Sequence, residues 1–351
     1  MLAGNILIWG EFPPNTHTGV SISNQTVLHF LQSENISPII IEEYSWNKKN
    51  IGKVFHFLRL YLKVIRIICK KKIKIFYFTL PLSVSGGFKF LAILPVIKLL
   101  SSKTVLKAHI HRGDFKDFVN KNTLNRIIVR CSFRFIDEIV VLSQAFLQDV
   151  LNFSTKLKVT VLHNTSLVES FTQRPFKEHR KEFICISNYI KSKGIYELIE
   201  CFRFVELQDI RLSVYGHFYD KLFYNKLKLS APVNVSLNGP LGRDDFWKVL
   251  NQSDCLIMPS WNEGQPIIII EAMSLGIPVI ATEIGDIPDM FGEKYKFLAK
   301  PGDIDSLFQC ILEFDRFEEK KIISEYLHQR YQNKYSNKSY KKRLLEIFGQ
   351  L

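Results

Sequence analysis

The segment from Asp254 to Asp289 constrains the fold of this chain more than any other part of the sequence. Cys255 to Met258 is a short apolar run, and Val279 to Ala281 is a second one. Such runs, bounded by turn residues, are typical of buried strands in a parallel sheet. Between them, Ile267 to Leu275 is long enough for a helix and precedes Gly276, the residue type that most easily follows a helix in the left-handed conformation. The segment predicts strand, loop, helix and strand in an α/β fold.

The loop and helix of this unit carry two glutamates, Glu263 and Glu271, eight positions apart. Ligands bind where a loop leaves the carboxyl end of a parallel strand and opens a helix, because backbone N–H groups face outward there. Gly264 allows close backbone approach. Two carboxylates would repel a phosphate, so they suit the hydroxyl groups of a ribose and a sugar beside it. In the structural alternative, Glu263 caps the helix region and Glu271 is a solvated helical residue.

Both glutamates belong to a larger pattern that resembles the E-x7-E signature of glycosyltransferase family 4, a family of retaining nucleotide-sugar transferases. The residues that carry the resemblance are Glu263, Gly264, Pro266, Glu271, Ala272, Gly276, Pro278 and Val279. The resemblance implies the GT-B fold: two Rossmann-like domains with parallel sheets facing a central cleft, and a C-terminal helix that crosses back to the first domain. It implies that Glu263 lies against the donor sugar and Glu271 holds the nucleotide ribose. The donor site would also include Gly264, Gln265, Pro266 and Ile267.

Length and composition agree with two domains. The chain has 351 residues, of which 46% are hydrophobic, so it can bury two cores. We expect a first domain over residues 1–166 and a second over 167–328, with a C-terminal helix over 329–351 packing back onto the first. Six cysteines without a close pair argue against a zinc site or a disulfide framework. Without an apolar run of bilayer length or a signal-peptide pattern, we expect a cytoplasmic protein that is soluble or peripheral.

The first strand-like run, Asn5 to Gly10, leads through a loop into a helical pattern near Gly19. A strand, a glycine-bearing loop and a helix are the usual opening of a Rossmann domain. Most single glycines before helices form turns. Here, Thr18 and Gly19 resemble the glycine pair of the family's first loop, where the backbone approaches the donor diphosphate, with Thr18 replacing the first glycine. We therefore assign Gly19 to the donor site.

A basic amphipathic pattern runs from Lys53 to Lys70. Its cations recur at steps of three or four, which places them on one face of a helix: Lys53, Arg59, Lys63, Arg66 and Lys70, continued by Lys71 and Lys72. Such a helix is typical of a surface that meets anionic lipid, although an ordinary domain helix with solvated lysines has the same pattern. In both interpretations we expect the apolar side to pack on the domain itself. The membrane-facing residues would be Lys63, Arg66, Lys70, Lys71 and Lys72.

A polar cluster follows the expected strand from Thr104 to Ile110, where several groups would point at the same edge of the cleft. It contains His109, His111, Arg112 and Asp114. The cluster resembles the family's segment at the acceptor side of the donor sugar, where a histidine lies near the reacting carbon. Because Gly113 follows it, His111 fits that role, but His109 has the same strand parity and stays an alternative. His109, Arg112 and Asp114 are assigned to the acceptor side.

The loop after Ile186 resembles the family's diphosphate-binding loop, which has a glycine and an arginine and, five positions on, a lysine and a glycine. Lys193 and Gly194 match this pattern, but Asn188 stands where the arginine is expected. An ammonium cannot replace a bidentate guanidinium clamp. Either Lys191 or Arg112 compensates, or the donor is held less tightly. Asn188 and Lys193 are assigned to the donor site.

These residues predict a retaining glycosyltransferase of the hexosyltransferase type that needs no metal or other cofactor. The donor would be a nucleoside diphosphate sugar of the UDP or GDP type, and the catalytic residues would be Glu263, His111 and Lys193. The formal net charge of +13 admits anionic partners. We expect a glycan acceptor, lipid-linked, in bacterial-type surface polysaccharide or lipopolysaccharide assembly on the inner face of the membrane. A nucleotide-sugar epimerase of the same fold is the alternative, and a non-enzymic basic binding protein is the third. Nucleic acid is not expected as a partner, because we find no recognition helix, zinc finger or aromatic and basic platform.

Overall fold

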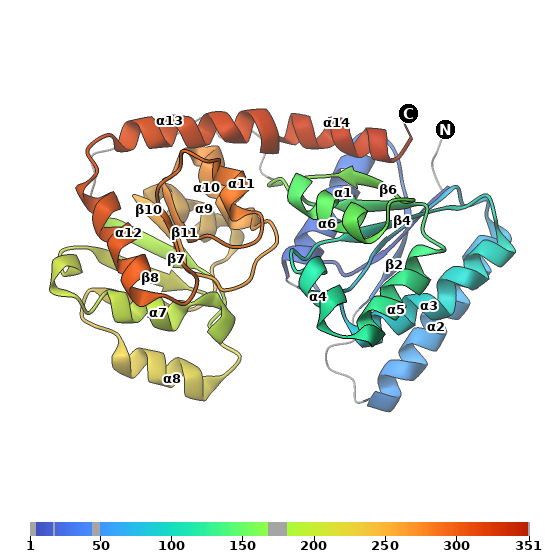
Figure 1. Ribbon diagram of the computed structural model, residues 1–351, viewed down its shortest axis with the longest axis horizontal. Coiled ribbons are helices and arrows are strands. Elements are labelled where there is room, and N and C mark those ends of the chain that lie inside the picture. The colour runs from blue at the N-terminus through green and yellow to red at the C-terminus, as the bar shows by residue number, and fades with distance from the viewer. Residues whose placement is uncertain (1–4, 17, 44–49, 168–180, 350–351) are drawn as a thin grey trace. The chain divides into compact units, whose positions relative to one another are not determined.

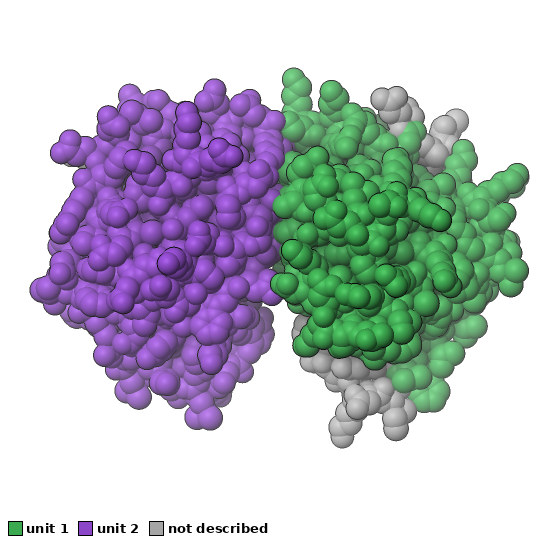
Figure 2. All heavy atoms as spheres, in the orientation of Figure 1, with its two compact units in different colours: residues 1–165, 337–351 green, residues 166–336 purple. Residues whose placement is uncertain are grey.

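The computed structural model describes residues 5–16, 18–43, 50–167 and 181–349. The chain divides into two compact units, which Figure 2 shows in different colours. Unit 1 comprises Met1–Thr165 and Asn337–Leu351, and unit 2 comprises Ser166–Ser336. Each unit has its own sheet with helices packed on it (Figure 1).

Unit 1 is built on a six-stranded sheet in which all neighbouring strands are parallel. In the spatial order of the sheet, the strands are β2 (Ile39–Glu42), β1 (Ile6–Gly10), β3 (Ile75–Thr79), β4 (Val105–Ile110), β5 (Glu138–Val141) and β6 (Lys158–Val161). The helices are α1 (Gly19–Ser33), α2 (Asn50–Lys70), α3 (Val84–Leu100), α4 (Phe115–Lys121), α5 (Thr123–Phe133), α6 (Gln144–Phe153) and α14 (Asn337–Ile347). The chain reverses its direction across the sheet between β1 and β3, which makes that place the topological switch point of unit 1.

The two faces of this sheet are covered by different helices. Leu7 and Trp9 of β1 belong to a buried cluster with residues of α2, α3 and α5, whereas Ile6 and Ile8 belong to a cluster with residues of α1 and α14. Successive side chains of a strand point to opposite faces. A strand that is buried on both faces therefore has a continuous run of apolar residues in the sequence. The C-terminal helix α14 therefore packs on unit 1, as expected for the GT-B fold.

Unit 2 contains a second six-stranded parallel sheet. In spatial order, its strands are β12 (Leu298–Ala299), β11 (Val279–Thr282), β10 (Cys255–Met258), β7 (Glu182–Ile186), β8 (Arg211–Tyr215) and β9 (Val235–Asn238). The α-helices are α7 (Ile195–Cys201), α8 (Lys221–Ser230), α9 (Arg243–Gln252), α10 (Ile267–Leu275), α11 (Ile287–Phe291), α12 (Ile304–Arg316) and α13 (Lys320–Arg330). Shorter turns are the 3-10 helices Lys191–Lys193 and Val205–Leu207 and the π-helix Tyr331–Tyr335. The switch point of unit 2 lies between β7 and β10.

The segment that constrained the fold most has the predicted structure. Strand β10 leads through a loop into α10, and β11 follows after Gly276. Gly276 has φ of 66°, and its N–H donates to backbone carbonyls of the helix end. The expected strand, loop, helix and strand are confirmed, because each boundary is set by a local signal that tertiary packing does not oppose.

Helix α2 differs from expectation on its apolar side. Leu60, Val64 and Ile68, spaced by four, are buried against unit 1. A second apolar set on the same helix lies in solvent: Val54, Phe55, Leu58 and Leu62. The prediction that the apolar side packs on its own domain is wrong for these four residues, because a straight helix can press just one side against a sheet.

The most apolar long segment of the sequence lies in α3. Ser83 caps this helix by accepting a hydrogen bond from the N–H of Gly86, at 3.1 Å, and Pro95 lies inside it. Within the described ranges, no helix is both long enough and apolar enough to cross a membrane.

Candidate functional site

In unit 2, the loops that follow β7 and β10 carry the predicted donor residues. These two strands are neighbours on either side of the switch point, although about seventy residues separate them in the sequence. The crevice outside the carboxyl ends of strands at a switch point is where open α/β sheets bind ligands. Lys193 follows β7, and Glu263 follows β10. The sheet topology therefore brings the two predicted catalytic residues of unit 2 to one place.

Lys193 and Glu263 form an ion pair, with Nζ 2.5 Å from Oε1. Both side chains are largely shielded from water, with 25% of Lys193 and 13% of Glu263 exposed. An ion pair shielded in this way is stronger than one on an open surface, because the local dielectric is lower. The pair leaves one cation available to an incoming anion when the carboxylate turns to another partner.

Two glycines hold these loops against each other. Gly194 has φ of 66°, and a Cβ placed on it would lie 1.9 Å from the carbonyl oxygen of Pro259. A Cβ on Gly285, which also has positive φ, would lie 2.1 Å from the carbonyl oxygen of Glu263. The N–H of Trp261 donates to the carbonyl of Ser192 at 2.8 Å. Close approach of the backbones, which a side chain would prevent, thus positions Lys193 beside Glu263.

Glu271 lies on α10 and is partly buried. Its Oε1 is 3.5 Å from Oγ of Ser166. Pro266 precedes the helix and makes no side-chain cap, so the first N–H groups of α10 face the loop that contains Gly264. Helix α10 therefore provides a carboxylate for a hydroxyl group and an N-terminus that suits a phosphate.

Gln265 is 4% exposed, and its Nε2 donates to Asp286 at 2.5 Å. The backbone of Asp286 in turn donates to the carbonyl of Gly264 at 3.2 Å. The side chain of this predicted donor residue is thus engaged inside unit 2, where it ties the Glu263 loop to the loop after β11.

Asn188, which stands in place of the expected arginine, accepts a hydrogen bond from the N–H of His217 at 3.3 Å. Nearby, Nζ of Lys191 lies 5.8 Å from the ring centre of Trp261, within the range of a cation–π contact. The amide of Asn188 therefore holds the loop after β8, while Lys191 is a second cation on the loop that carries Lys193.

In unit 1, a pocket of about 350 Å³ lies at the switch point between β1 and β3. Its walls come from the loops after β1, β3 and β4, the residue after β2, and α3. The polar residues around it are Glu11, Thr18, Glu43, Thr79, Ser83, Lys89, His111 and Arg112. A pocket of this size, with a small number of convergent polar groups, has the character of a small-molecule site.

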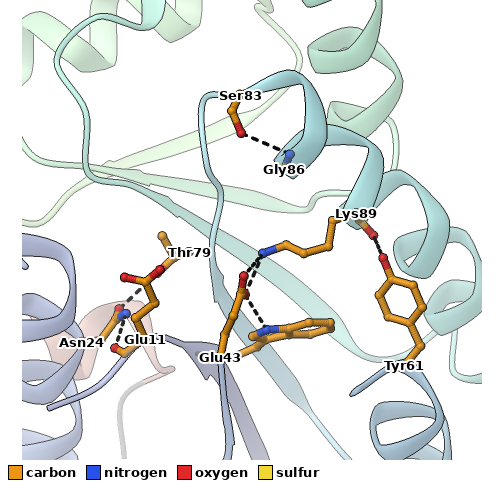
Figure 3. Close-up of polar contacts among 9 residues, drawn as sticks. Glu11, Asn24, Glu43, Tyr61, Thr79, Ser83, Gly86 and Lys89 are labelled. Atoms are coloured by element: carbon orange, nitrogen blue, oxygen red, sulfur yellow. Dashed lines mark hydrogen bonds and ion pairs between the residues drawn. The ribbon is translucent and has the colours of Figure 1, made fainter. Parts of the chain in front are cut away.

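A buried ion pair that the sequence did not indicate lies in this pocket (Figure 3). Nζ of Lys89 is 2.9 and 2.7 Å from the two carboxylate oxygens of Glu43, and Nε1 of Trp9 donates to the same carboxylate at 3.0 Å. Tyr61 donates to the backbone carbonyl of Lys89 at 2.7 Å, and burial, followed by the charge of Glu43, raises the pKa of Tyr61 to about 12. Lys89, which lies between Phe88 and Phe90 in the apolar run of α3, was the signal that could have identified this pair.

Of the two predicted histidines, His111 lines the pocket and His109 lies behind it, 1% exposed. The two rings are 3.8 Å apart between centres, and Nδ1 of His109 is hydrogen bonded to the hydroxyl of Tyr77. Burial lowers the pKa of His111 to about 3, and burial together with His111 lowers the pKa of His109. His111 is therefore neutral at physiological pH and can donate or accept a hydrogen bond.

Arg112 and Asp114 pair with each other, with Nε of Arg112 donating to Oδ1 at 2.8 Å. Arg112 reaches the pocket, and Asp114 precedes α4. At the other wall, the hydroxyl of Thr18 caps α1 by accepting from the N–H of Ser21 at 3.1 Å, and a Cβ on Gly19 would meet nothing within 4 Å. The role of Gly19 at a diphosphate stays a prediction.

Comparison with known proteins finds a family match in unit 2. Residues 168–334 match the family Glycosyl transferases group 1. The matched residues include Lys193, Glu263 and Glu271, and the match does not separate family 4 from the rest of the group.

Two curated relatives extend the match. A putative teichuronic acid biosynthesis glycosyltransferase of Bacillus subtilis is 25% identical over 227 residues, which are 65% of this chain and 56% of the relative. A UDP-Gal:alpha-D-GlcNAc-diphosphoundecaprenol alpha-1,3-galactosyltransferase of Escherichia coli is 29% identical over 117 residues, 32% of this chain and 30% of the relative. The chain spans about half the length, or less, of these curated relatives.

A crystal structure of HepE from Anabaena, in complex with UDP and glucose, superposes with a TM-score of 0.72 over 99% of both chains, at 15% identity. At that identity the likeness shows the fold, which is GT-B. The matched family and both relatives are described as glycosyltransferases or a galactosyltransferase, and the superposed structure contains UDP and glucose.

Among the residues that the structure describes, no three of the types His, Cys, Asp and Glu are grouped so that they could hold a metal ion.

Proposed function

We propose that this protein is a retaining glycosyltransferase of the family 4 type, which moves a hexose from a nucleoside diphosphate of the UDP or GDP type to a hydroxyl group of a glycan. The observation that carries the proposal is the contact of Lys193 with Glu263 at the switch point, on the loop that leads to Glu271. This arrangement offers one cation to a diphosphate and two carboxylates to flanking hydroxyl groups.

In this reaction, the bond between the anomeric carbon of the sugar and the phosphate oxygen breaks, and the electron pair stays on that oxygen. The acceptor oxygen bonds to the same face of the carbon, and its proton passes to the departing phosphate oxygen. Lys193 and the N-terminus of α10 stabilise the charge that develops on the diphosphate. Glu263 positions the sugar, and Glu271 holds the ribose. His111, neutral because it is buried, hydrogen bonds a sugar hydroxyl group.

The pocket of unit 1 takes the acceptor in this proposal. Its pair of Glu43 and Lys89 offers a carboxylate and an ammonium to sugar hydroxyl groups, and Arg112 adds a cation at the wall. The name of the relative from Escherichia coli specifies a diphosphoundecaprenol acceptor, and that of the relative from Bacillus subtilis refers to teichuronic acid biosynthesis. The first name supports a lipid-linked acceptor, and the second supports a role in surface polysaccharide assembly. We place this acceptor at the inner face of the membrane, in surface polysaccharide or lipopolysaccharide assembly.

Release of nucleotide tests the proposal. We expect UDP- or GDP-sugars to yield free nucleotide when a glycan acceptor is present, with the anomeric configuration retained in the product. We also expect the rate to persist in EDTA, because lysine and backbone N–H groups hold the diphosphate in this mechanism. A new isomer of the donor sugar formed without an acceptor would favour the epimerase alternative. Loss in EDTA with recovery in manganese would contradict the metal-independent mechanism.

Glu271 and Glu263 should respond differently to removal of their carboxylates. We expect Glu271→Ala to weaken nucleoside diphosphate binding by about tenfold or more, because a charge-assisted hydrogen bond to the ribose is lost. Glu263→Ala should lower kcat by about a hundredfold and change nucleotide affinity little, because its partner is the sugar. Calorimetry and initial rates measure the two effects, with Glu283→Ala as the control at an exposed glutamate. Wild-type values for both variants would show that the site lies elsewhere.

A further inference from the structure

Helix α2 of unit 1 presents an apolar stripe to solvent. Val54, Phe55, Leu58 and Leu62 are each between 50% and 69% exposed. Their spacing places them on one side of the helix, next to the buried side formed by Leu60, Val64 and Ile68. Scattered exposed apolar residues are ordinary, but four along one stripe of one helix form a contiguous patch, which is typical of an interaction site.

A basic stripe runs along the same helix, on the other border of the apolar one. It contains Arg59, Lys63, Arg66 and Lys70, all exposed. Helix α2 therefore has three sides: one buried in unit 1, one apolar in solvent and one basic in solvent. The last two together have the composition of helices that lie in the interface of a bilayer, with the apolar stripe among the acyl chains and the cations at the headgroups.

The apolar stripe continues onto the neighbouring helix α3 and borders a hollow. Phe88 of α3 is 53% exposed, and a hollow of about 690 Å³ lies between it and residues Val54 and Leu58 of α2. Glu43 and Lys89 line both this hollow and the acceptor pocket. The hollow beside the exposed stripe is therefore adjacent to the polar pocket that His111 lines.

We propose that the surface formed by Val54, Phe55, Leu58, Leu62 and Phe88 docks onto an anionic lipid bilayer by inserting its side chains. The basic stripe supports this partner, because anionic headgroups complement it. A second copy of the chain would bring two basic stripes together, and like charges at short range repel. The hollow gives the apolar part of an amphiphilic acceptor a path from the bilayer to the pocket, an aspect that rests on the proposed function.

Vesicle flotation with the full chain tests the docking surface. We expect wild-type protein to bind phosphatidylcholine vesicles that contain phosphatidylglycerol, and to bind pure phosphatidylcholine more weakly but measurably. High salt should reduce the binding without abolishing it, because a Debye length of ~3 Å at about 1 M screens the cations but leaves the inserted side chains. For the double variant Phe55→Ser and Leu62→Ser, the partition coefficient between vesicles and water should fall at least about tenfold for both vesicle types.

The control is the double variant Leu222→Ser and Leu229→Ser in α8, whose side chains are 82% and 89% exposed. It removes two exposed apolar side chains from unit 2, as the α2 variant does from unit 1, and we expect wild-type vesicle binding. Equal binding by the two double variants, or wild-type binding that high salt abolishes, would overturn insertion. Self-association in sedimentation that the α2 variant alone prevents would identify a second copy as the partner. Transfer to a water-soluble acceptor is measured in parallel, so that a failed proposed function and a failed docking surface are distinguished.

Discussion

Replacing Lys193 by methionine should lower kcat/KM for sugar transfer by about a hundred- to a thousandfold, which is typical for loss of one preorganised group that stabilises developing charge. Methionine keeps the length and the apolar stem of the side chain but removes the ammonium. The departing diphosphate would lose the charge that stabilises it, since Asn188 occupies the place of the expected arginine and provides no charge. We expect kcat to fall as well as KM to rise, because charge on the leaving group grows toward the transition state.

The measurement pairs initial rates with the melting temperature. Lys193→Met also leaves Glu263 without its ion partner, so a lower melting temperature is expected and is separated from catalysis by the double variant Lys193→Met and Glu263→Gln. That variant should recover stability while the rate stays low. Lys228→Met changes an exposed lysine of α8 and should retain the wild-type rate. A Lys193→Met protein that transfers sugar at the wild-type rate would exclude Lys193 as the leaving-group cation.

Replacing Lys107 by methionine should lower the free energy of unfolding of unit 1 by roughly 3–5 kcal/mol, the cost of removing one partner of a buried ion pair. Glu138 would keep the exposed Lys158, at 3.2 Å, as its remaining ion partner. Lys107 in β4 is 6% exposed, and its Nζ is 2.5 Å from Oε2 of Glu138, which is 2% exposed. The same ammonium donates to the carbonyl of Ile347 at the end of α14. The variant therefore loosens both the middle of the sheet and the attachment of the C-terminal helix.

Glu138 shows why one change has such an effect. Burial raises its pKa, but the hydrogen bonds from Lys107 and Thr160, together with the charges of Lys107 and Lys158, outweigh burial and hold the pKa below its ordinary value. Because the folded pKa lies below the unfolded one, this stabilisation is present at neutral pH and is lost as the pH falls through the acidic range. Without Lys107 the carboxylate would have to be buried with weaker partners or take up a proton.

Urea unfolding followed by hydrogen exchange in the strands of unit 1 measures this change separately from unit 2. The double variant Lys107→Met and Glu138→Leu is the control, because removing both charges avoids the unpaired carboxylate and should recover a large part of the loss. Exchange at the end of α14 should stay faster than in the wild type even in the double variant, since the bond to Ile347 is absent in both. Unchanged stability of Lys107→Met would mean that Lys158, already 3.2 Å from Oε1 of Glu138, compensates the carboxylate without Lys107.

The sequence predicted the units of the fold where the signals are local. The apolar runs around Cys255 and Val279, and Gly276 between them, specify strand, helix and strand without reference to the rest of the chain, and the structure confirms them. The periodicity of α2 likewise showed which residues share a side. It did not show which apolar side the sheet would cover, because Leu58 and Leu60 have the same hydrophobicity and differ in what packs against them.

The candidate site likewise combines residues that the sequence indicated with contacts that only the structure showed. Residue types and their resemblance to a family pattern selected Lys193 and Glu263 one by one, but their contact depends on β7 and β10 becoming neighbours in the sheet. The pair of Glu43 and Lys89 had no motif, and it forms because the fold places Lys89 of α3 beside Glu43, the residue after β2, where a shielded lysine needs a carboxylate. The sequence by itself determined the elements and the candidate groups, since local propensity and hydrophobic pattern act over a few residues. Only the tertiary structure decided which groups meet and which apolar side stays in water, because those outcomes depend on contacts between segments far apart in the chain.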